Sequence, residues 1–116
     1  MTAIRRLVMN SRKHNEPHQV YLLQGVGTDY QKIGFSYDVT ARMQEFNVPF
    51  ELEILKVILV SNRAVALTLE QTLHKDFGDY HVRGEWFSGI RVNDFTRRAN
   101  IILGTNKVIH RLWAGI

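Results

Sequence analysis

Apolar and β-branched residues form three short runs in the first half of the chain. Two of them, residues 19–23 and 30–35, are separated by a glycine- and aspartate-containing segment, residues 25–29, that is typical of a hairpin turn. Nearly every residue of the third run, 52–60, is apolar or β-branched, which predicts a strand covered on both faces in the middle of a small sheet. The pattern therefore predicts an antiparallel hairpin and one further strand.

Three segments have helical spacing of apolar residues. Residues 38–46 predict a short helix with Asp38 as its N-cap, ended by the Asn-Val-Pro at 47–49. Ser61 or Asn62 is expected to cap a second helix that runs to about Phe77, before a glycine stops it. A third helix is predicted from about residue 93 to 103. The inward positions are Val39, Met43 and Phe46 in the first helix, Ala66, Leu69, Leu73 and Phe77 in the second, and Phe95, Ala99 and Ile102 in the third.

Composition limits the class of protein. A chain of 116 residues with 45% hydrophobic content suits one domain with a single core. The absence of cysteine excludes disulfides and thiolate zinc sites, and it favours a reducing compartment. The only apolar run near the start is too short for a signal peptide or a membrane span. We therefore expect a cytoplasmic protein that is not inserted in a membrane.

Charge is unevenly distributed. The formal net charge is +4, and residues 1–14 and 91–116 carry +4 each, so the segment between them carries −4. Basic arms of this kind suit a polyanion such as nucleic acid, although terminal Lys and Arg also simply keep a small protein in solution. The basic residues expected to contact nucleic acid are Arg5, Arg6, Arg12, Lys13, Arg97, Arg98 and Arg111.

Three residues suggest a site for phosphate chemistry. Gly34 lies near the end of a predicted strand, where a missing side chain lets a bulky group approach the backbone, and Arg42 follows one turn into the next helix. A phosphate could lie between them. Glu70 lies in an otherwise apolar helix, so its carboxylate must either face solvent or hold a partner, such as a metal ion or Arg42.

The aromatic pair Trp86 and Phe87 has two interpretations. The first, which we favour, is a core plug that buries both rings and holds the sheet against the helices. The second is stacking on nucleobases. The pattern of the chain leaves both open.

Two short signatures and two later features occur in a fixed order. Gln-Val-Tyr at residues 19–21 is followed after ten residues by Lys-Ile-Gly at 32–34, and Arg42 stands eight residues after that glycine. A leucine-rich helix with Glu70 and the ending Arg-Gly-Glu-Trp-Phe at 83–87 come next. In this order, residues 19–89 resemble the GIY-YIG endonuclease superfamily. The Lys-Ile-Gly and Gly-Glu-Trp-Phe segments are similar to a small branch found in phages and mobile elements.

The resemblance implies an α/β (α+β) fold with a three-stranded antiparallel sheet flanked by helices. It divides the chain into a basic N-terminal arm (1–18), a nuclease-like domain (19–89) and a basic C-terminal helix and tail packed on that domain (90–116). The implied activity is metal-dependent hydrolysis of nucleic-acid phosphodiester bonds, with DNA as the expected substrate. Specific cutting would need a homodimer, formed for instance through the apolar tail at 105–116, a partner protein, or the basic arms.

The resemblance also assigns roles to residues. Glu70 would hold one Mg²⁺ or Mn²⁺, and Arg42 would stabilise charge on the phosphoryl group. Tyr21 would act as general base, which requires a lowered phenol pKa, or would position the attacking water. Lys32 replaces the tyrosine of the family's second signature and would contact phosphate, and Tyr30 would supply a nearby hydroxyl.

One position departs from the family pattern in a way that argues against catalysis. Phe46 stands one turn after Arg42, where the family carries a polar residue, and a phenyl ring has no polar atom with which to form a hydrogen bond. The alternative to an active nuclease is therefore a non-catalytic nucleic-acid-binding module on the same fold. In that case the basic arms would supply most of the affinity through counterion release.

Overall fold

The computed structural model describes residues 14–105. The predictions for Arg5, Arg6, Arg12, Lys13 and Arg111, and for a dimer formed through the C-terminal tail, lie outside the described residues. The elements in chain order are β1 (His18–Gly25), β2 (Gln31–Ser36), α2 (Val39–Met43), β3 (Leu52–Val60), α3 (Arg63–Asp76), the 3₁₀ turn η1 (Gly78–Tyr80), β4 (His81–Arg83), β5 (Trp86–Phe87) and α4 (Val92–Thr105).

The strands form one antiparallel sheet in the order β3-β1-β2-β5-β4. The α+β class predicted from the sequence is confirmed, and the expected three strands, β1, β2 and β3, are its long members. Two short strands outside the expected three, β5 and β4, extend the sheet beyond β2. The turn between them contains Gly84, whose φ of 57° lies in the left-handed region that favours glycine.

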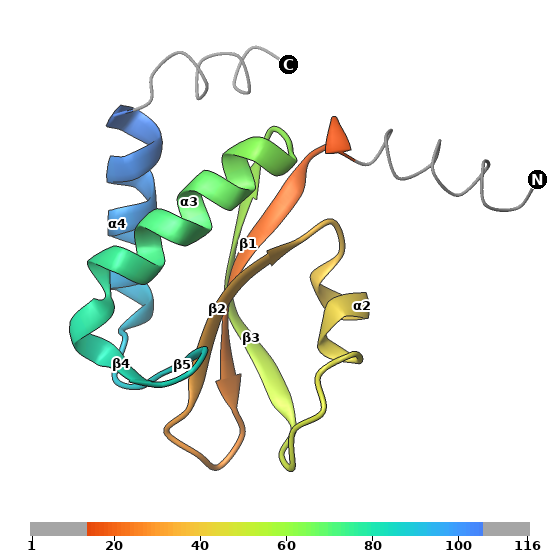
Figure 1. Ribbon diagram of the computed structural model, residues 1–116, viewed down its shortest axis with the longest axis vertical. Coiled ribbons are helices and arrows are strands. Elements are labelled where there is room, and N and C mark those ends of the chain that lie inside the picture. The colour runs from red at the N-terminus through yellow and green to blue at the C-terminus, as the bar shows by residue number, and fades with distance from the viewer. Residues whose placement is uncertain (1–13, 106–116) are drawn as a thin grey trace, which may run out of the picture.

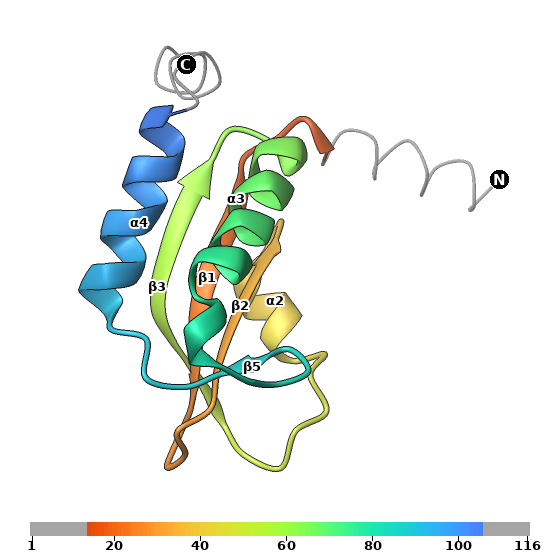
Figure 2. The same cartoon turned by 60° about the vertical axis from the view of Figure 1, so that its left-hand side comes forward.

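Helices cover both faces of the sheet. In Figures 1 and 2, α3 and α4 lie on one face and α2 lies on the other. The side chains of β1 alternate between the two faces, because successive residues of a strand point in opposite directions. Val20 and Leu22 enter the core beneath α3 and α4, whereas Tyr21 and Leu23 pack with Val39 of α2.

The helix predictions hold with one change of length. Asp38 caps α2 by accepting a hydrogen bond from the Ala41 amide at 3.2 Å, and Asn62 caps α3 by accepting one from the Val65 amide at 3.0 Å. The predicted inward residues of α3 and α4 are all buried. The first helix is shorter than predicted, because α2 ends at Met43 and Phe46 lies in the turn that follows.

β3 has the predicted bounds but not the predicted environment. It is the edge strand beside β1, and Ile54 and Leu59 are 41% and 47% exposed. The expectation of a central strand covered on both faces is therefore wrong. A continuous apolar run indicated burial on both faces, but β1 occupies the central position, and part of the apolar surface of β3 faces solvent.

Within residues 14–105, none of the helices has the length and apolar character needed to cross a membrane.

Candidate active site

Tyr21 of β1 reaches across to the neighbouring strand. The register pairs Tyr21 with Gly34 of β2, and the hydroxyl of the tyrosine fills the space in which a side chain at residue 34 would lie. A Cβ added to Gly34 would come within 2.6 Å of Tyr21 Cζ. The bulky group that approaches Gly34 is therefore the Tyr21 ring, where the sequence had suggested a phosphate.

Burial controls the ionisation of Tyr21. The residue is 2% exposed, and this loss of solvent raises the pKa of its phenol above 10.0. Arg42 opposes the shift by hydrogen bonding and by its charge, but burial outweighs it, and the charges of Glu70 and Glu85 add to the rise. The lowered pKa that a general-base role of Tyr21 requires is thus not found in the protein without ligands, because one nearby cation does not offset burial of the ring.

Arg42 lies on α2 beside this phenol. Its Nη1 donates a hydrogen bond to Glu45 Oε1 at 3.1 Å, in an ion pair whose side chains are both largely exposed. The guanidinium carbon lies 5.2 Å from the centroid of the Phe46 ring. The carboxylate that pairs with Arg42 is therefore Glu45, and not Glu70 as one of the two sequence interpretations suggested.

Lys32 of β2 is held by an anion and two aromatic rings. Its side chain is 9% exposed, and Nζ donates to Glu85 Oε2 at 2.7 Å. The same Nζ lies 4.8 Å from the Phe46 ring centroid and 5.2 Å from that of Trp86. The Lys32 ammonium lowers the pKa of Glu85, first through the hydrogen bond and then through its charge.

Glu70 lies on α3, one helical turn before His74. Its side chain is 22% exposed, and desolvation raises the pKa of its carboxyl above 4.5 despite the opposing charges of His74 and Lys32. Glu70 Oε1 is 3.9 Å from His74 Nε2. His74 Nε2 also donates to the carbonyl oxygen of Ile33 at 2.8 Å, so this imidazole ties α3 to β2.

These side chains surround a part of β2 that has no strand neighbour on one side. β5 pairs with Gln31 and Lys32 only, which leaves residues 33–36 open along that edge. Tyr21 and Arg42 approach this segment from the α2 face, and Glu70 approaches it from the α3 face. The charge of Arg42 opposes the raised pKa of the Tyr21 phenol and that of Glu70 adds to it, so both groups act on this phenol.

Tyr30 lies at the beginning of β2 rather than at the Tyr21 hydroxyl. Its ring is 44% exposed and stacks on Phe50, with centroids 6.1 Å apart and an angle of 20° between the planes. Trp86 lies against both of these rings. The core-plug interpretation holds for Phe87, which is 1% exposed, but not for Trp86, which is only partly buried.

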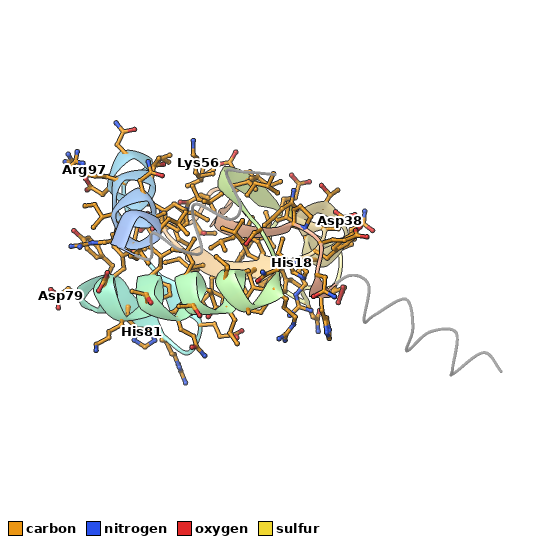
Figure 3. All side chains as sticks on the ribbon, turned by 90° about the horizontal axis from the view of Figure 1, so that it is seen from above. His18, Asp38, Lys56, Asp79, His81 and Arg97 are labelled. Atoms are coloured by element: carbon orange, nitrogen blue, oxygen red, sulfur yellow. The ribbon has the colours of Figure 1, made fainter. Side chains whose placement is uncertain are left out.

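The basic residues of α4 are remote from this site. Figure 3 shows Arg97 and Asp38, the cap of α2, at opposite sides of the molecule. Arg97 Nη1 lies 3.9 Å from Asp94, and Arg98 Nε lies 3.5 Å from Asp76. Both guanidinium groups are outward, as predicted, but each has a carboxylate beside it.

The residues that build this site lie within a segment shared with other proteins. The T5orf172 domain matches residues 18–103. The chain belongs to the T5orf172 family. No curated protein and no solved structure gives a significant match. The resemblance of this T5orf172 domain to GIY-YIG nucleases stays a prediction.

One carboxylate of the T5orf172 domain, that of Glu70, is a candidate ligand for a divalent cation. Within the described part of the chain, no three His, Cys, Asp or Glu side chains cluster as a metal cage. Glu70 has a partly desolvated carboxylate near the part of β2 that lacks a strand neighbour. Burial raises the pKa of this carboxyl, and a bound cation would stabilise its charged form. Mg²⁺ commonly takes one or two carboxylates and completes its shell with phosphate oxygens and water.

Three contributors to this T5orf172 site were not assigned by the sequence analysis. Glu85 was noted only as part of a motif, although it pairs with Lys32. His74 stood one turn after Glu70, and that spacing was the signal that could have identified it. Phe46 was taken as an argument against catalysis, but its ring contacts both Lys32 and Arg42.

Proposed function

We propose that this T5orf172 domain is a metal-dependent endonuclease of the GIY-YIG type that hydrolyses DNA phosphodiester bonds in the cytoplasm. The observation that supports the proposal best is the meeting of Tyr21, Arg42 and Glu70 at the open edge of β2. These groups come from three separate elements and influence one another electrostatically. A phenol, a guanidinium and a desolvated carboxylate form a set that phosphoryl-transfer chemistry can use.

Arg42 is the group best placed to bind the scissile phosphate. Its side chain is 46% exposed, and the carboxylate of its ion pair, Glu45, is itself largely exposed, so an incoming phosphate can replace that partner. Lys32 adds a second positive charge at the Phe46 ring, with its Nζ 4.8 Å from the ring centroid. Charge that develops on the phosphoryl oxygens would be stabilised by these donors without large rearrangement, because the ring holds both cations in place.

The raised pKa of Tyr21 fits the second of its two predicted roles, which is to position the attacking water. A phenol whose pKa is raised stays protonated at neutral pH, so its hydroxyl can accept a hydrogen bond from a water molecule and orient that water. The fixed position of the ring over Gly34 makes this orientation reproducible. Glu70 would hold the divalent cation, which when bound supplies Lewis-acid stabilisation to phosphate oxygens.

The test is a time course of the full chain on single-stranded and duplex DNA with Mg²⁺, Mn²⁺ or EDTA. We expect cutting that needs the metal and is lost in Glu70→Ala, while DNA binding in EDTA is kept. Glu53→Ala is the matched control, because Glu53 is an exposed carboxylate on the edge strand β3. Binding without cutting by the wild-type protein would instead favour the non-catalytic binding module.

A further inference from the structure

Three aromatic rings from distant parts of the chain meet at one end of the sheet. Tyr30 precedes β2, Phe50 precedes β3 and Trp86 begins β5. The ring centroids are 6.1 Å apart for Tyr30 and Phe50, 5.9 Å for Tyr30 and Trp86, and 5.6 Å for Phe50 and Trp86. We call these three residues the aromatic cluster.

The aromatic cluster is not part of the interior. The two hydrophobic cores of the described residues contain Phe46 and Phe87 but none of the three cluster rings. Tyr30 is 44% exposed, and Phe50 and Trp86 are both partly exposed. Three large rings left at the surface in mutual contact form an apolar patch of a kind that often marks a binding site.

Positive charge borders the aromatic cluster on the side of the candidate active site. Lys32 Nζ lies 5.2 Å from the Trp86 ring centroid and 4.8 Å from that of Phe46. The Arg42 guanidinium lies 5.2 Å from the same Phe46 centroid. The contacts therefore run without a break from Trp86 through Lys32 and Phe46 to Arg42. A ligand that combines flat rings with phosphates can contact the aromatic rings and the two cations at the same time.

A recess adjoins the same rings. It has a volume of about 300 Å³ and lies between α2 and the beginning of β3. Phe50 belongs both to the aromatic cluster and to the wall of the recess, and Phe46 lines the recess while it contacts the two cations. The remaining lining residues are Met43, Gln44, Val48, Glu51 and Leu52.

We propose that the aromatic cluster is a stacking platform for unpaired DNA bases next to the phosphate held by Arg42, so that the substrate is single-stranded or locally unpaired DNA. This inference rests on the proposed nuclease function, and it adds the substrate class. Bases inside a duplex stack on each other and do not present their faces, whereas an unpaired base can lie on an exposed ring. Lys32 and Arg42 supply the complementary charge for the adjoining phosphates, which an uncharged or acidic partner would not use.

The experiment measures binding without cleavage. The full chain carrying Glu70→Ala, in EDTA, is titrated into a fluorescently labelled oligothymidylate and into an abasic oligomer of the same length. The two probes carry the same phosphates, so the ratio of their affinities reports the bases alone. We expect the oligothymidylate to bind about tenfold more tightly than the abasic oligomer.

Variants localise this preference. Tyr30→Leu and Trp86→Leu keep an apolar side chain but remove a ring, and each is expected to reduce the ratio severalfold. Tyr30→Phe keeps the ring and should keep the ratio. Tyr80→Leu is the matched control, because Tyr80 is 40% exposed and packs on Phe77, away from the aromatic cluster. Thermal melts confirm that each variant is folded.

The outcomes separate the two proposals. Equal affinity for both probes in the parent protein, or a ratio that folded Tyr30→Leu and Trp86→Leu both retain, would overturn the stacking platform. A ratio that falls in these two variants and not in the controls would support it. The cleavage time course on the protein with Glu70 intact decides the nuclease function independently, because the binding measurement uses no metal.

Discussion

Tyr21 and Gly34 fit together across two neighbouring strands, with the tyrosine hydroxyl in the space that any side chain at residue 34 would fill. The tyrosine is 2% exposed, and its ring packs among the residues between β1 and α2. The glycine is therefore needed for the position of the phenol. Its φ is not in the left-handed region, so the need is for space and not for backbone freedom.

Gly34→Ala is expected to lower the free energy of unfolding by about 1–3 kcal/mol, because the new methyl group overpacks a filled region. It should also displace the Tyr21 hydroxyl and reduce DNA cleavage, although no catalytic group has been removed. Chemical denaturation and the cleavage time course measure the two effects. Gly78→Ala is the control, since a Cβ there would meet nothing within 4 Å. A fully active and stable Gly34→Ala protein would contradict this account of Tyr21.

Arg42→Ala is expected to slow cleavage about 10²- to 10³-fold, the loss typical for one donor to a developing negative charge. Stability should fall by about 0.5–1.5 kcal/mol, because the solvent-screened ion pair with Glu45 contributes little but the buried Tyr21 phenol loses a hydrogen-bond partner. Single-turnover rates measure the first effect. Arg63→Ala is the matched control: its guanidinium also lies over an aromatic ring, 5.4 Å from the Phe35 centroid, but at the beginning of α3. Equal losses in the two variants would argue against a specific role for Arg42.

Phe46→Leu tests whether an aromatic ring positions the two cations. Each cation–π contact is worth about 0.5–1 kcal/mol at a partly exposed site, and this ring contacts both Lys32 and Arg42. We expect DNA affinity or cleavage rate to fall several-fold in Phe46→Leu and to be kept in Phe46→Tyr. If Phe46→Leu behaves as wild type while it remains folded, the ring serves only to fill space against Tyr21, Leu23 and Val39.

Glu70→Gln should stabilise the protein in EDTA at neutral pH. Burial raises the folded-state pKa of Glu70, so the native state favours the protonated carboxyl. Relative to the variant, the wild-type protein keeps its full stability well below pH 4.5 and loses stability as the pH rises through the raised pKa. Melting temperatures across this range provide the measurement. A Glu70→Gln protein that is less stable than wild type at neutral pH would show that Glu70 gains more from its neighbours than it loses by burial.

Glu85→Gln should show the opposite sign. The Lys32 ammonium lowers the folded-state pKa of Glu85, so the stability that this carboxylate contributes is present above pH 4.5 and is lost as the pH falls through the lowered pKa. The effect is expected to be small, since the Glu85 side chain is 77% exposed and solvent screens the pair. The same series of melts detects it, and high salt should reduce it further.

Local signals in the sequence predicted local structure well. The hairpin turn, the caps Asp38 and Asn62, and the inward residues of α3 and α4 all depend on neighbours in the chain, and each is confirmed. The positions of Tyr21, Arg42 and Glu70 on three elements also followed from these boundaries. Their meeting at the edge of β2 could be expected only from the family resemblance, because contacts across β2 involve no short-range pattern.

One prediction failed, and two further properties could not be read from the sequence, all for reasons that lie in tertiary contacts. β3 is apolar enough for a central strand, but the order of strands places it at the edge. The pKa of Tyr21 depends on how completely the ring is desolvated, which the sequence does not specify. Phe46 lacks a polar atom, yet the quadrupole of its ring attracts Lys32 and Arg42, and that role is visible only when the three side chains are placed together.

The edge position of β3 also affects how copies of the chain meet. An edge strand presents unpaired amides and carbonyls on which a strand of another molecule could add, and exposed Ile54 and Leu59 would favour such growth. Lys56 lies between them and points outward from β3 in Figure 3. Two molecules that aligned their β3 strands would bring like charges together. Charged side chains on edge strands disfavour such pairing, so Lys56 is the residue of β3 that we expect to oppose it.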